Sequence, residues 1–164
     1  MNMDITNIHK RIINAPKEKI SPLLKTLATK HDKVWPHRHW PAIKFKDGLS
    51  VGSKGGHGII KYVIEEYKEG DTITFRFLEP KGFDGIHRFD ISILDKYKTE
   101  IKHSIIMQAK GTAAIQWVIA IRWLHDALIE NAFDCIENNV SNTKTFTKWN
   151  VWVRLWRFIF KRLR

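Results

Sequence analysis

The feature that most constrains the fold is a long proline-free stretch, from Thr112 to about Asn138, near the end of the chain. It begins directly after Gly111, and its apolar residues recur at the 100° per residue of an α-helix. The apolar residues occupy two adjoining sectors of the helix surface, which is more than a helix with one buried face needs. We therefore expect this helix to be buried on more than one side. One apolar sector contains Trp117, Ile121, Leu124, Leu128, Ala132 and Cys135, and the adjoining one contains Ile115, Val118, Ile119, Ile129, Phe133 and Ile136.

Four segments before this helix are typical of β-strands. Apolar and polar residues alternate in them, and the connections between them are short, which predicts an antiparallel meander with one buried face. An earlier strand and a short helix that follows Pro16 are also expected. The predicted strands are residues 5–13, 58–67, 72–78, 85–94 and 99–109, and the inward faces of the last two contain His87, Phe89, Ile91 and Ile93, and Ile101, His103, Ile105, Met107 and Ala109.

Three local phrases connect this order of elements with a known family. They are Ile-Ile-Asn-Ala-Pro at residues 12–16, Leu-Ser-Val-Gly at 49–52, and Glu-Glu-Tyr-Lys-Glu-Gly-Asp at 65–71. Over residues 4 to 138 the chain resembles the SRPBCC superfamily, which includes START-related, polyketide cyclase-like and pollen-allergen-like proteins. The resemblance implies an α+β helix-grip fold, in which a curved antiparallel sheet wraps around a long C-terminal helix. It also implies a cavity for lipids, sterols, polyketides or other apolar molecules.

Composition limits the class of protein further. The 164 residues fit one domain, with a ligand-binding body at 1–140 and a tail at 141–164. The N-terminus has no signal-peptide pattern, and no apolar run approaches the ~18 residues of a membrane span. Cys135 is the only cysteine and lies in an apolar sector, which suits a reducing cytoplasm and inert packing.

Polar residues on faces that should be buried are the candidates for chemistry. His87 and His103 lie on the apolar faces of two strands, and Arg122, His125 and Asp126 interrupt the second apolar sector of the helix. Buried polar groups need partners, so this set predicts either a polar end of the cavity or an internal ion pair with histidines bound to carbonyls. The predicted ligand-binding residues are Phe75, His87, Phe89, His103, Arg122, His125, Asp126 and Trp40.

Two other patterns are weaker. The glycine-rich run at 51–58 lacks the Gly-Lys-Ser/Thr ending of a phosphate loop and precedes a strand, so a bend or bulge is the better interpretation, with His57 a candidate for the cavity mouth. His31, His37 and His39 lie close together, but no third ligand is set by spacing and a solvated loop is expected. Neither a metal nor a cofactor is predicted.

The tail contains much of the positive charge. The net charge is +11, and seven basic residues and no acidic one follow Val140. On a helix its large apolar residues share one arc beside a basic flank, which suits contact with an anionic membrane surface, docking on the chain's own surface, or a homodimer. The apolar arc contains Trp149, Trp152, Val153, Trp156, Ile159, Phe160 and Leu163, and the flank contains Arg154, Arg157 and Lys161.

These patterns favour a cytoplasmic protein, working at the inner membrane surface if the tail meets lipid, that binds a hydrophobic small molecule or lipid. An enzyme of the cyclase or aromatase sort is the alternative, with His87 and His103 as catalytic candidates and Arg122 polarising a carbonyl. A third interpretation is an interaction module that dimerises through the tail. Nucleic-acid binding is disfavoured because apolar residues dominate the tail stripe.

Overall fold

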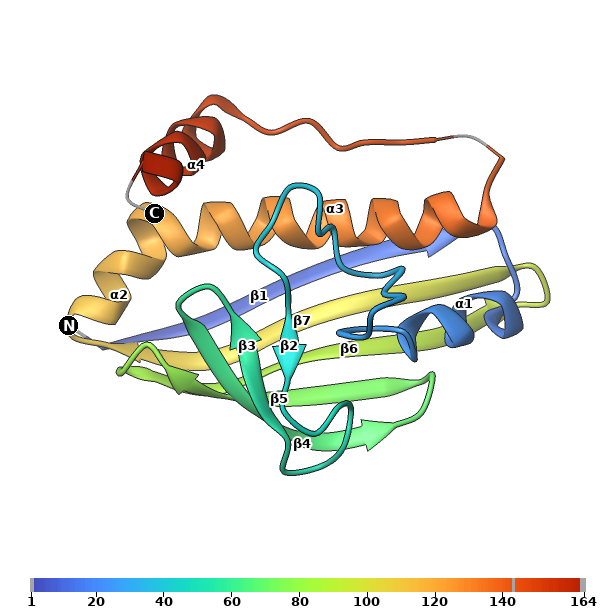
Figure 1. The fold of residues 1–164 in the computed structure, drawn as a ribbon, viewed down its shortest axis with the longest axis horizontal. Coiled ribbons are helices and arrows are strands. Elements are labelled where there is room, and N and C mark those ends of the chain that lie inside the picture. Colours follow the sequence, from blue (N-terminus) through green and yellow to red (C-terminus); the bar gives the residue numbers. More distant parts are fainter. Residues whose placement is uncertain (1, 143, 163–164) are drawn as a thin grey trace.

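A computed structural model describes residues 2–142 and 144–162. Its centre is one curved, antiparallel sheet of seven strands in the order β1-β7-β6-β5-β4-β3-β2 (Figure 1). Each hydrogen-bonded pair of strands is antiparallel, as the short connections predict. The strands are β1 (Asn2–Ile13), β2 (Lys44–Phe45), β3 (Lys54–His57), β4 (Ile60–Lys68), β5 (Thr72–Glu79), β6 (Phe83–Asp95) and β7 (Lys98–Lys110).

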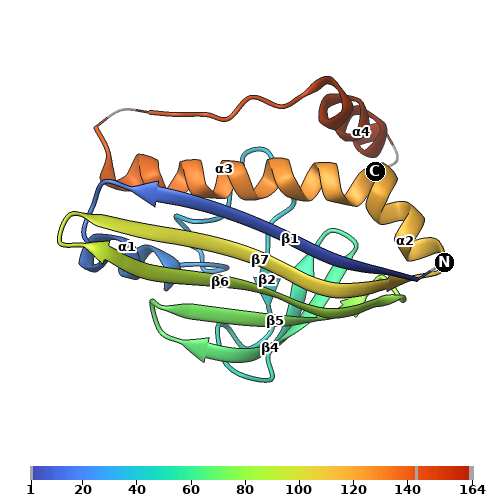
Figure 2. The same cartoon turned by 180° about the vertical axis from the view of Figure 1, so that it is seen from behind.

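One long helical segment lies across the concave face of this sheet (Figures 1 and 2). It consists of α2 (Thr112–Gln116), a π-helical turn η1 (Trp117–Ile121) and α3 (Arg122–Val140). The short helix α1 (Lys17–Leu24) follows β1, and Pro16 is its N-cap. The α+β helix-grip fold expected from the sequence is confirmed.

Strand periodicity accounts for most of the sheet. On β7, Ile101, His103, Ile105, Met107 and Ala109 are all buried, as the alternation predicts. On β6 the prediction fails at one place: Ile93 is 61% exposed, beside an irregularity in the pairing with β7 between Ile93 and Asp95. Ile93 still pairs in register with Thr99, and the irregularity comes after it, so its exposure reflects its place at the hairpin end of the sheet, where the covered part of the β6 face ends at Ile91.

The long helix is less evenly buried than its sequence predicts. Ile129, Phe133 and Ile136 of the second sector are buried, but Ile115, Val118 and Ile119 are about half exposed. The wide turn η1 contains Val118 and Ile119 and precedes the buried group, and it shifts the helical phase, so a single count of 100° per residue does not hold across it. The expected burial on several sides is therefore correct for α3 and wrong for α2 and η1.

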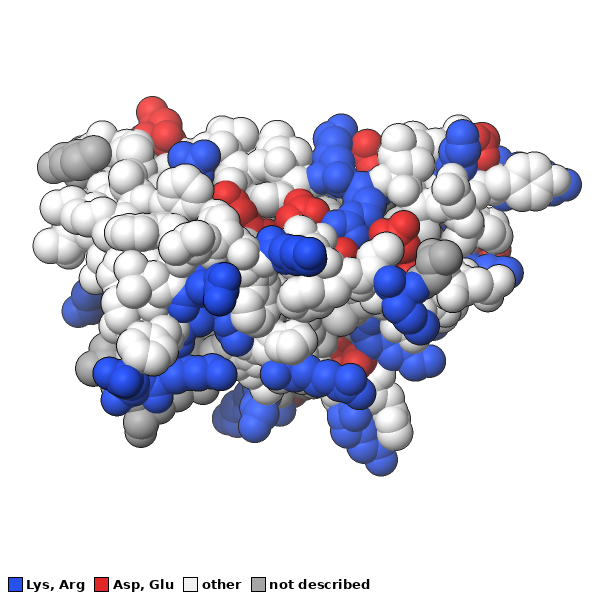
Figure 3. All heavy atoms as spheres, turned by 90° about the horizontal axis from the view of Figure 1, so that it is seen from above, with Lys and Arg blue, Asp and Glu red and all other residues white. Residues whose placement is uncertain are grey.

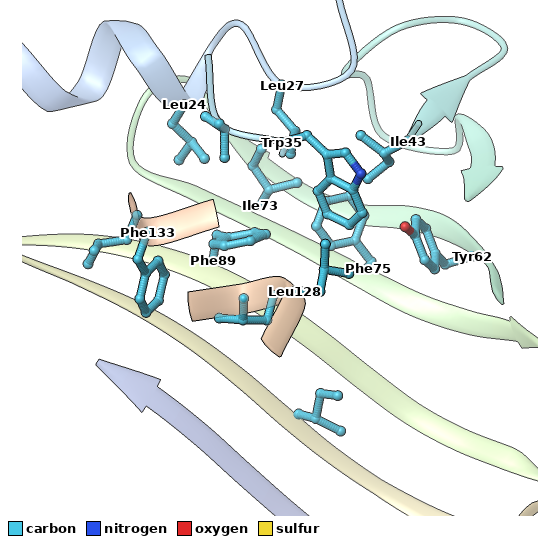
Figure 4. Close-up of a cluster of buried hydrophobic side chains, with 14 of the residues drawn as sticks. Leu24, Leu27, Trp35, Ile43, Tyr62, Ile73, Phe75, Phe89, Leu128 and Phe133 are labelled. Carbon is cyan, nitrogen blue, oxygen red and sulfur yellow. The ribbon is translucent and has the colours of Figure 1, made fainter. Parts of the chain in front are cut away.

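The core fills the space between α3 and the sheet. Aromatic and aliphatic side chains from α1, the loop after it, β4, β5, β6 and α3 meet there (Figure 4). Trp35 of the loop and Phe75 of β5 lie close together in this view, with Tyr62 beside them. The largest side chains with almost no exposure include Tyr62, Phe75, Phe89 and Phe133.

The glycine-rich run forms β3 and its turns. Gly56 has φ of +151°, and a Cβ atom there would clash with the carbonyl oxygen of Ile60 on the paired strand β4. Only glycine permits this close approach of two backbones. The run is a structural element of the sheet, in agreement with the bend expected from the sequence.

The tail folds back onto the body. Residues 144–150 run along α3, and α4 (Val151–Arg162) lies beside the η1 end of the long helix (Figures 1 and 2). Val153 is buried, and the indole nitrogens of Trp152 and Trp156 donate to the carbonyl of Ile119, at 2.7 and 3.0 Å. In the structure the tail therefore docks on the chain's own surface, which is one of the three alternatives expected from the sequence.

Asn131 of α3 is the polar anchor of the tail. Its side-chain oxygen accepts from the indole nitrogens of Trp149, at 2.7 Å, and Trp40, at 3.1 Å. The guanidinium of Arg157 lies over both of these rings, 4.1 and 4.5 Å from their centroids. Leu163 lies outside the described residues, and no helix within them is long and apolar enough to cross a membrane.

Candidate functional site

Two histidines on neighbouring strands meet inside the grip. His87 of β6 and His103 of β7 both point inward, because Phe89 pairs with His103 and His87 lies two residues before it. Nδ1 of His87 and Nε2 of His103 are 3.3 Å apart. The sequence placed these residues on the correct faces, and the register brings them into contact.

The remaining nitrogens of this cluster have no partner. Nε2 of His87, Nδ1 of His103 and both ring nitrogens of His125 are buried and form no hydrogen bond with any described residue. The buried hydroxyl of Tyr62 also has no hydrogen-bond partner among the described residues, and the Tyr62 ring lies 4.6 Å from the ring of His87. Each buried polar atom without a partner costs about 1–3 kcal/mol, so the cluster is a costly feature that packing alone does not explain.

Burial keeps these histidines neutral. Removal from water, followed by the nearby His125, holds the pKa values of His87 and His103 well below the usual value. Burial also lowers the pKa of His125, although Asp126 opposes the effect. At neutral pH the ring nitrogens of His87, His103 and His125 are therefore free to accept or donate hydrogen bonds as neutral imidazoles.

A small cavity lies among these side chains. Its volume is about 20 Å³, which is room for about one water molecule and not for an organic ligand. The expected apolar cavity is thus filled by side chains in this conformation. Its lining is Trp35, Ile43, His57, Phe75, His87, Phe89, His103, His125, Leu128 and Ile129.

His57 connects this cavity with the surface. An open cleft of about 690 Å³ lies along β2, β3 and the start of β4, and His57 lines both the cleft and the cavity. Its ring packs 4.9 Å from Trp35 and 6.0 Å from Tyr62. Burial lowers the pKa of His57 to about 3, so the ring between cleft and cavity is uncharged at neutral pH. The cleft lining also includes Lys44, Lys54 and Lys61.

Five of the eight predicted ligand-binding residues line the cavity, and three do not. Trp40 is buried but belongs to the Asn131 anchor of the tail. The Arg122 side chain is 55% exposed and 3.8 Å from Asp126, so its expected place at the cavity is wrong; a guanidinium keeps its hydration where the backbone allows. The five that line the cavity are Phe75, His87, Phe89, His103 and His125.

Asp126 belongs to a charged interface between α3 and β1 that the sequence reasoning missed. Its Oδ1 atom accepts from Nδ2 of Asn7 at 3.0 Å and lies 3.0 Å from Nε2 of His9. Nδ1 of His9 is 2.7 Å from Glu130. Burial acts against a charge on His9, but Asp126 and Glu130 outweigh it and raise the pKa of His9 to about 9.

The interface continues along the helix. Arg11 contacts Asp134 at 2.6 Å, Glu130 at 2.8 Å and Glu137 at 3.2 Å. The signal was present in the sequence: Asn7, His9 and Arg11 alternate on one strand face, and acidic residues recur at helical spacing on α3. It is found only when the two patterns are compared.

The loop histidines lie apart from this site. His31, His37 and His39 are exposed; His37 contacts Asp32 at 3.1 Å, and His39 packs against Phe146 and Trp149.

Comparison with solved structures places the architecture among helix-grip proteins. No family model matches the chain, and no curated protein matches it. A norcoclaurine synthase point mutant from Thalictrum flavum, in complex with a transition-state analogue, has a TM-score of 0.63 and 13% identity, over 86% of this chain and 99% of that one. CalU16 from Micromonospora echinospora has a TM-score of 0.60 and 12% identity, covering 98% and 88%.

A conserved protein of unknown function from Enterococcus faecalis has a TM-score of 0.60 and 14% identity, covering 98% of this chain and 87% of its own. At these identities the likeness is one of fold.

Proposed function

We propose that the protein binds a small, largely apolar molecule with at least one polar group, held between α3 and the sheet at the histidine cluster. The observation that carries the proposal is the set of partnerless ring nitrogens on His87, His103 and His125, among the aromatic rings of Phe75 and Phe89. Ligand sites combine an apolar lining with a few converging polar groups of this kind.

Binding needs space that the closed conformation lacks, and the cleft beside His57 is the proposed route. His57 lines both the cleft and the cavity, and it packs on Trp35, which lines the cavity and donates its indole N–H to the carbonyl of Pro41 at 2.8 Å. A change of rotamer at His57 would join the two volumes. Norcoclaurine synthase, with a similar fold, was solved with a transition-state analogue bound, which supports a small organic ligand here.

The test is native mass spectrometry of freshly purified protein, with His103→Phe as the variant and His31→Phe as the matched control. A bound organic mass is expected in the wild type and the control, and it should be lost or reduced at least tenfold in His103→Phe. Anilinonaphthalene sulfonate provides a second probe, whose fluorescence with each form is then titrated. No bound mass and equal dye affinity in all three forms would contradict the proposal.

An enzyme of the cyclase type is a second candidate. The observation that favours it is the neutral imidazole pair of His87 and His103, 3.3 Å apart, since neutral imidazoles can serve as general bases. Once a ligand is identified, its turnover by the wild type and by His87→Gln and His103→Gln decides. Loss of turnover with binding kept supports an enzyme, whereas no turnover by the wild type leaves a binding protein.

We propose in addition that the apolar surface of α2, η1 and α4 contacts an anionic membrane. Several large side chains of these helices are about half exposed, and the helices meet where Trp152 donates to Ile119. Figure 3, seen from the side of α4, shows a mostly uncharged surface at that end of the molecule, with Lys and Arg side chains beside it. Basic side chains lie beside this apolar surface, which suits acidic headgroups. The exposed apolar residues are Ile115, Val118, Ile119, Trp152, Leu155, Phe158 and Phe160, and the basic ones are Arg154, Arg157 and Lys161.

Sedimentation with phosphatidylglycerol vesicles tests the membrane contact. The variant Leu155→Ser with Phe158→Ser should lose most vesicle binding, whereas Ile93→Ser with Tyr97→Ser, more exposed and on the β6–β7 hairpin, should keep it. Binding should also weaken with salt, because surface charges are screened. If both variants bind vesicles as the wild type does, and Leu155→Ser with Phe158→Ser instead converts a dimer to a monomer, the surface is a dimer interface.

A further inference from the structure

One group of side chains at the inner face of α3 has the composition and spacing of a metal site. His9 of β1 and His125 and Asp126 of α3 each offer a ligand atom, and these atoms all lie within 4.8 Å of one another. Among the described residues, 2–142 and 144–162, no other group of three or more His, Cys, Asp or Glu side chains meets this spacing. It is separate from the exposed loop histidines.

The distances suit one shared ion. Nε2 of His9 is 3.0 Å from Oδ1 of Asp126, and Nδ1 of His125 is 3.5 Å from the same oxygen. Ligands bound to zinc at about 2.0–2.1 Å in tetrahedral geometry lie roughly 3.3 Å from one another. Two of the three pairs are thus already at that separation.

The surroundings hold two of these side chains in the required orientation. Nδ1 of His9 is 2.7 Å from a carboxylate oxygen of Glu130, which orients the ring with Nε2 toward Asp126, and a metal at Nε2 would replace the proton that this nitrogen shares with Asp126. Histidine ligands of metals commonly donate their other ring N–H to a carboxylate in this way. Asn7 donates to Oδ1 of Asp126 at 3.0 Å and so fixes the carboxylate as well.

His125 is the observation that points to a missing ligand. Both of its ring nitrogens are buried and form no hydrogen bond with any described residue, and Oδ1 of Asp126, 3.5 Å from Nδ1, lies at the limit of hydrogen-bond distance. A structural histidine would be expected to bond at least one nitrogen. A metal at Nδ1 would provide the partner that the protein does not.

We propose that His9, His125 and Asp126 bind a divalent transition-metal ion, with zinc as the representative. Two imidazoles and a carboxylate suit zinc and its neighbours better than magnesium or calcium, which prefer oxygen ligands. Three protein ligands leave one coordination position for water or for a ligand oxygen. His125 also lines the histidine cavity, so the ion lies beside that cavity. The metal proposal does not depend on the proposed organic ligand.

The test uses chelator-treated, tag-free protein and ZnCl₂, with bound metal measured by equilibrium dialysis and elemental analysis. One zinc per chain is expected, and MgCl₂ in excess should not displace it. His125→Phe keeps a ring of similar size and removes the nitrogens, and it should weaken zinc binding at least a hundredfold. The matched control is His31→Phe with His37→Phe in the exposed loop, which should bind zinc as the wild type does.

Thermal unfolding with and without zinc is a second measurement, which distinguishes loss of zinc binding from a change in the stability of the variant itself. Zinc should raise the Tm of the wild type and the control, and should leave the Tm of His125→Phe unchanged, because only binding to the folded state stabilises it. Asp126→Asn should behave as His125→Phe does. Absence of stoichiometric zinc in the wild type, equal binding by His125→Phe, or loss of zinc in the loop variant alone would each overturn the proposal.

Discussion

At the scale of single residues, the interior of this protein is unusual for its uncharged histidines. His57, His87, His103 and His125 all have lowered pKa values because they are buried, whereas His9 has a raised pKa because two carboxylates hold its proton. Burial prevails at four of these histidines, including His125 with Asp126 at 3.5 Å, whereas at His9 the contacts with Asp126 and Glu130 together outweigh it.

A single substitution at His125 should make the protein more stable. His125→Phe removes two buried ring nitrogens that form no hydrogen bond and loses only the 3.5 Å contact of Nδ1 with Asp126, so we expect removal of the unfavourable burial to be the larger effect. We expect the free energy of unfolding in metal-free buffer to rise by about 1–2 kcal/mol, as measured by urea denaturation. A loss of stability of similar size would indicate that Asp126 or another neighbour holds the ring.

Stability should fall in mild acid. The unfolded chain takes up protons at histidine near pH 6.5, whereas the folded chain keeps His57, His87 and His103 neutral to lower pH. Their contribution is therefore complete above about pH 6.5 and is lost below it, by up to ~1.4 kcal/mol per pH unit for each histidine. His9 acts in the opposite sense: its contribution is present below about pH 6.5 and is lost as the pH rises through about 9.

Urea unfolding across this range provides the measurement. His125→Phe should reduce the acid slope, since it removes one of the histidines whose pKa is lowered by burial. A free energy of unfolding that stays level from about pH 8 to about pH 5 would show that these rings are accessible to protons in the folded state.

At the scale of elements, α3 is the structural partner of three different parts of the chain. One side packs on the sheet, a second carries the acidic residues that bind His9 and Arg11 of β1, and a third presents Asn131 to the tail. Because three sides of α3 make contacts with other parts of the chain, both apolar and polar residues are needed around most of its circumference.

Loss of the Asn131 side chain should release the tail. Asn131→Ala leaves the indole nitrogens of Trp40 and Trp149 without their acceptor in a largely dry contact. We expect a loss of about 2–4 kcal/mol in the free energy of unfolding and faster proteolysis between residues 144 and 150. Asn139→Ala, on the exposed side of the same helix, is the control and should change neither. Unchanged proteolysis in Asn131→Ala would mean that Val153 and the α4 indoles are sufficient to hold the tail.

At the scale of the whole molecule, body and tail share one packed unit. Trp40 precedes β2 and Trp149 precedes α4, yet the indole nitrogens of both donate to the same oxygen of Asn131 and both rings lie under Arg157. Contacts of this kind couple the end of the chain to its beginning.

Unfolding should therefore be a single transition. Tryptophan fluorescence, to which Trp149, Trp152 and Trp156 of the tail contribute three of the seven tryptophans, and far-ultraviolet circular dichroism, which reports the sheet and α3, should give the same urea midpoint. An early fluorescence transition, before loss of the sheet signal, would show that the tail is an independent unit.

Much of the fold was predictable from local patterns in the sequence. About half of the residues of the candidate site were predictable in the same way. The alternation on β6 and β7 sets the inward faces of His87 and His103, because side chains in a strand have a period of two regardless of the rest of the molecule. The exposure of Arg122 and of Ile119 was not predictable, because the π-helical turn changes the helical phase and no residue type signals it.

The sequence by itself determined the elements, their order and the faces they bury, since these follow from periodicity and from where glycine and proline interrupt it. Only the tertiary structure decided which polar residues meet. His9 and Asp126 are 117 positions apart, and Trp149 lies 18 residues beyond Asn131 on a different element. Such contacts depend on strand register and on how a helix is rotated over the sheet, and those are set by the packing of the whole core rather than by any local stretch of the chain.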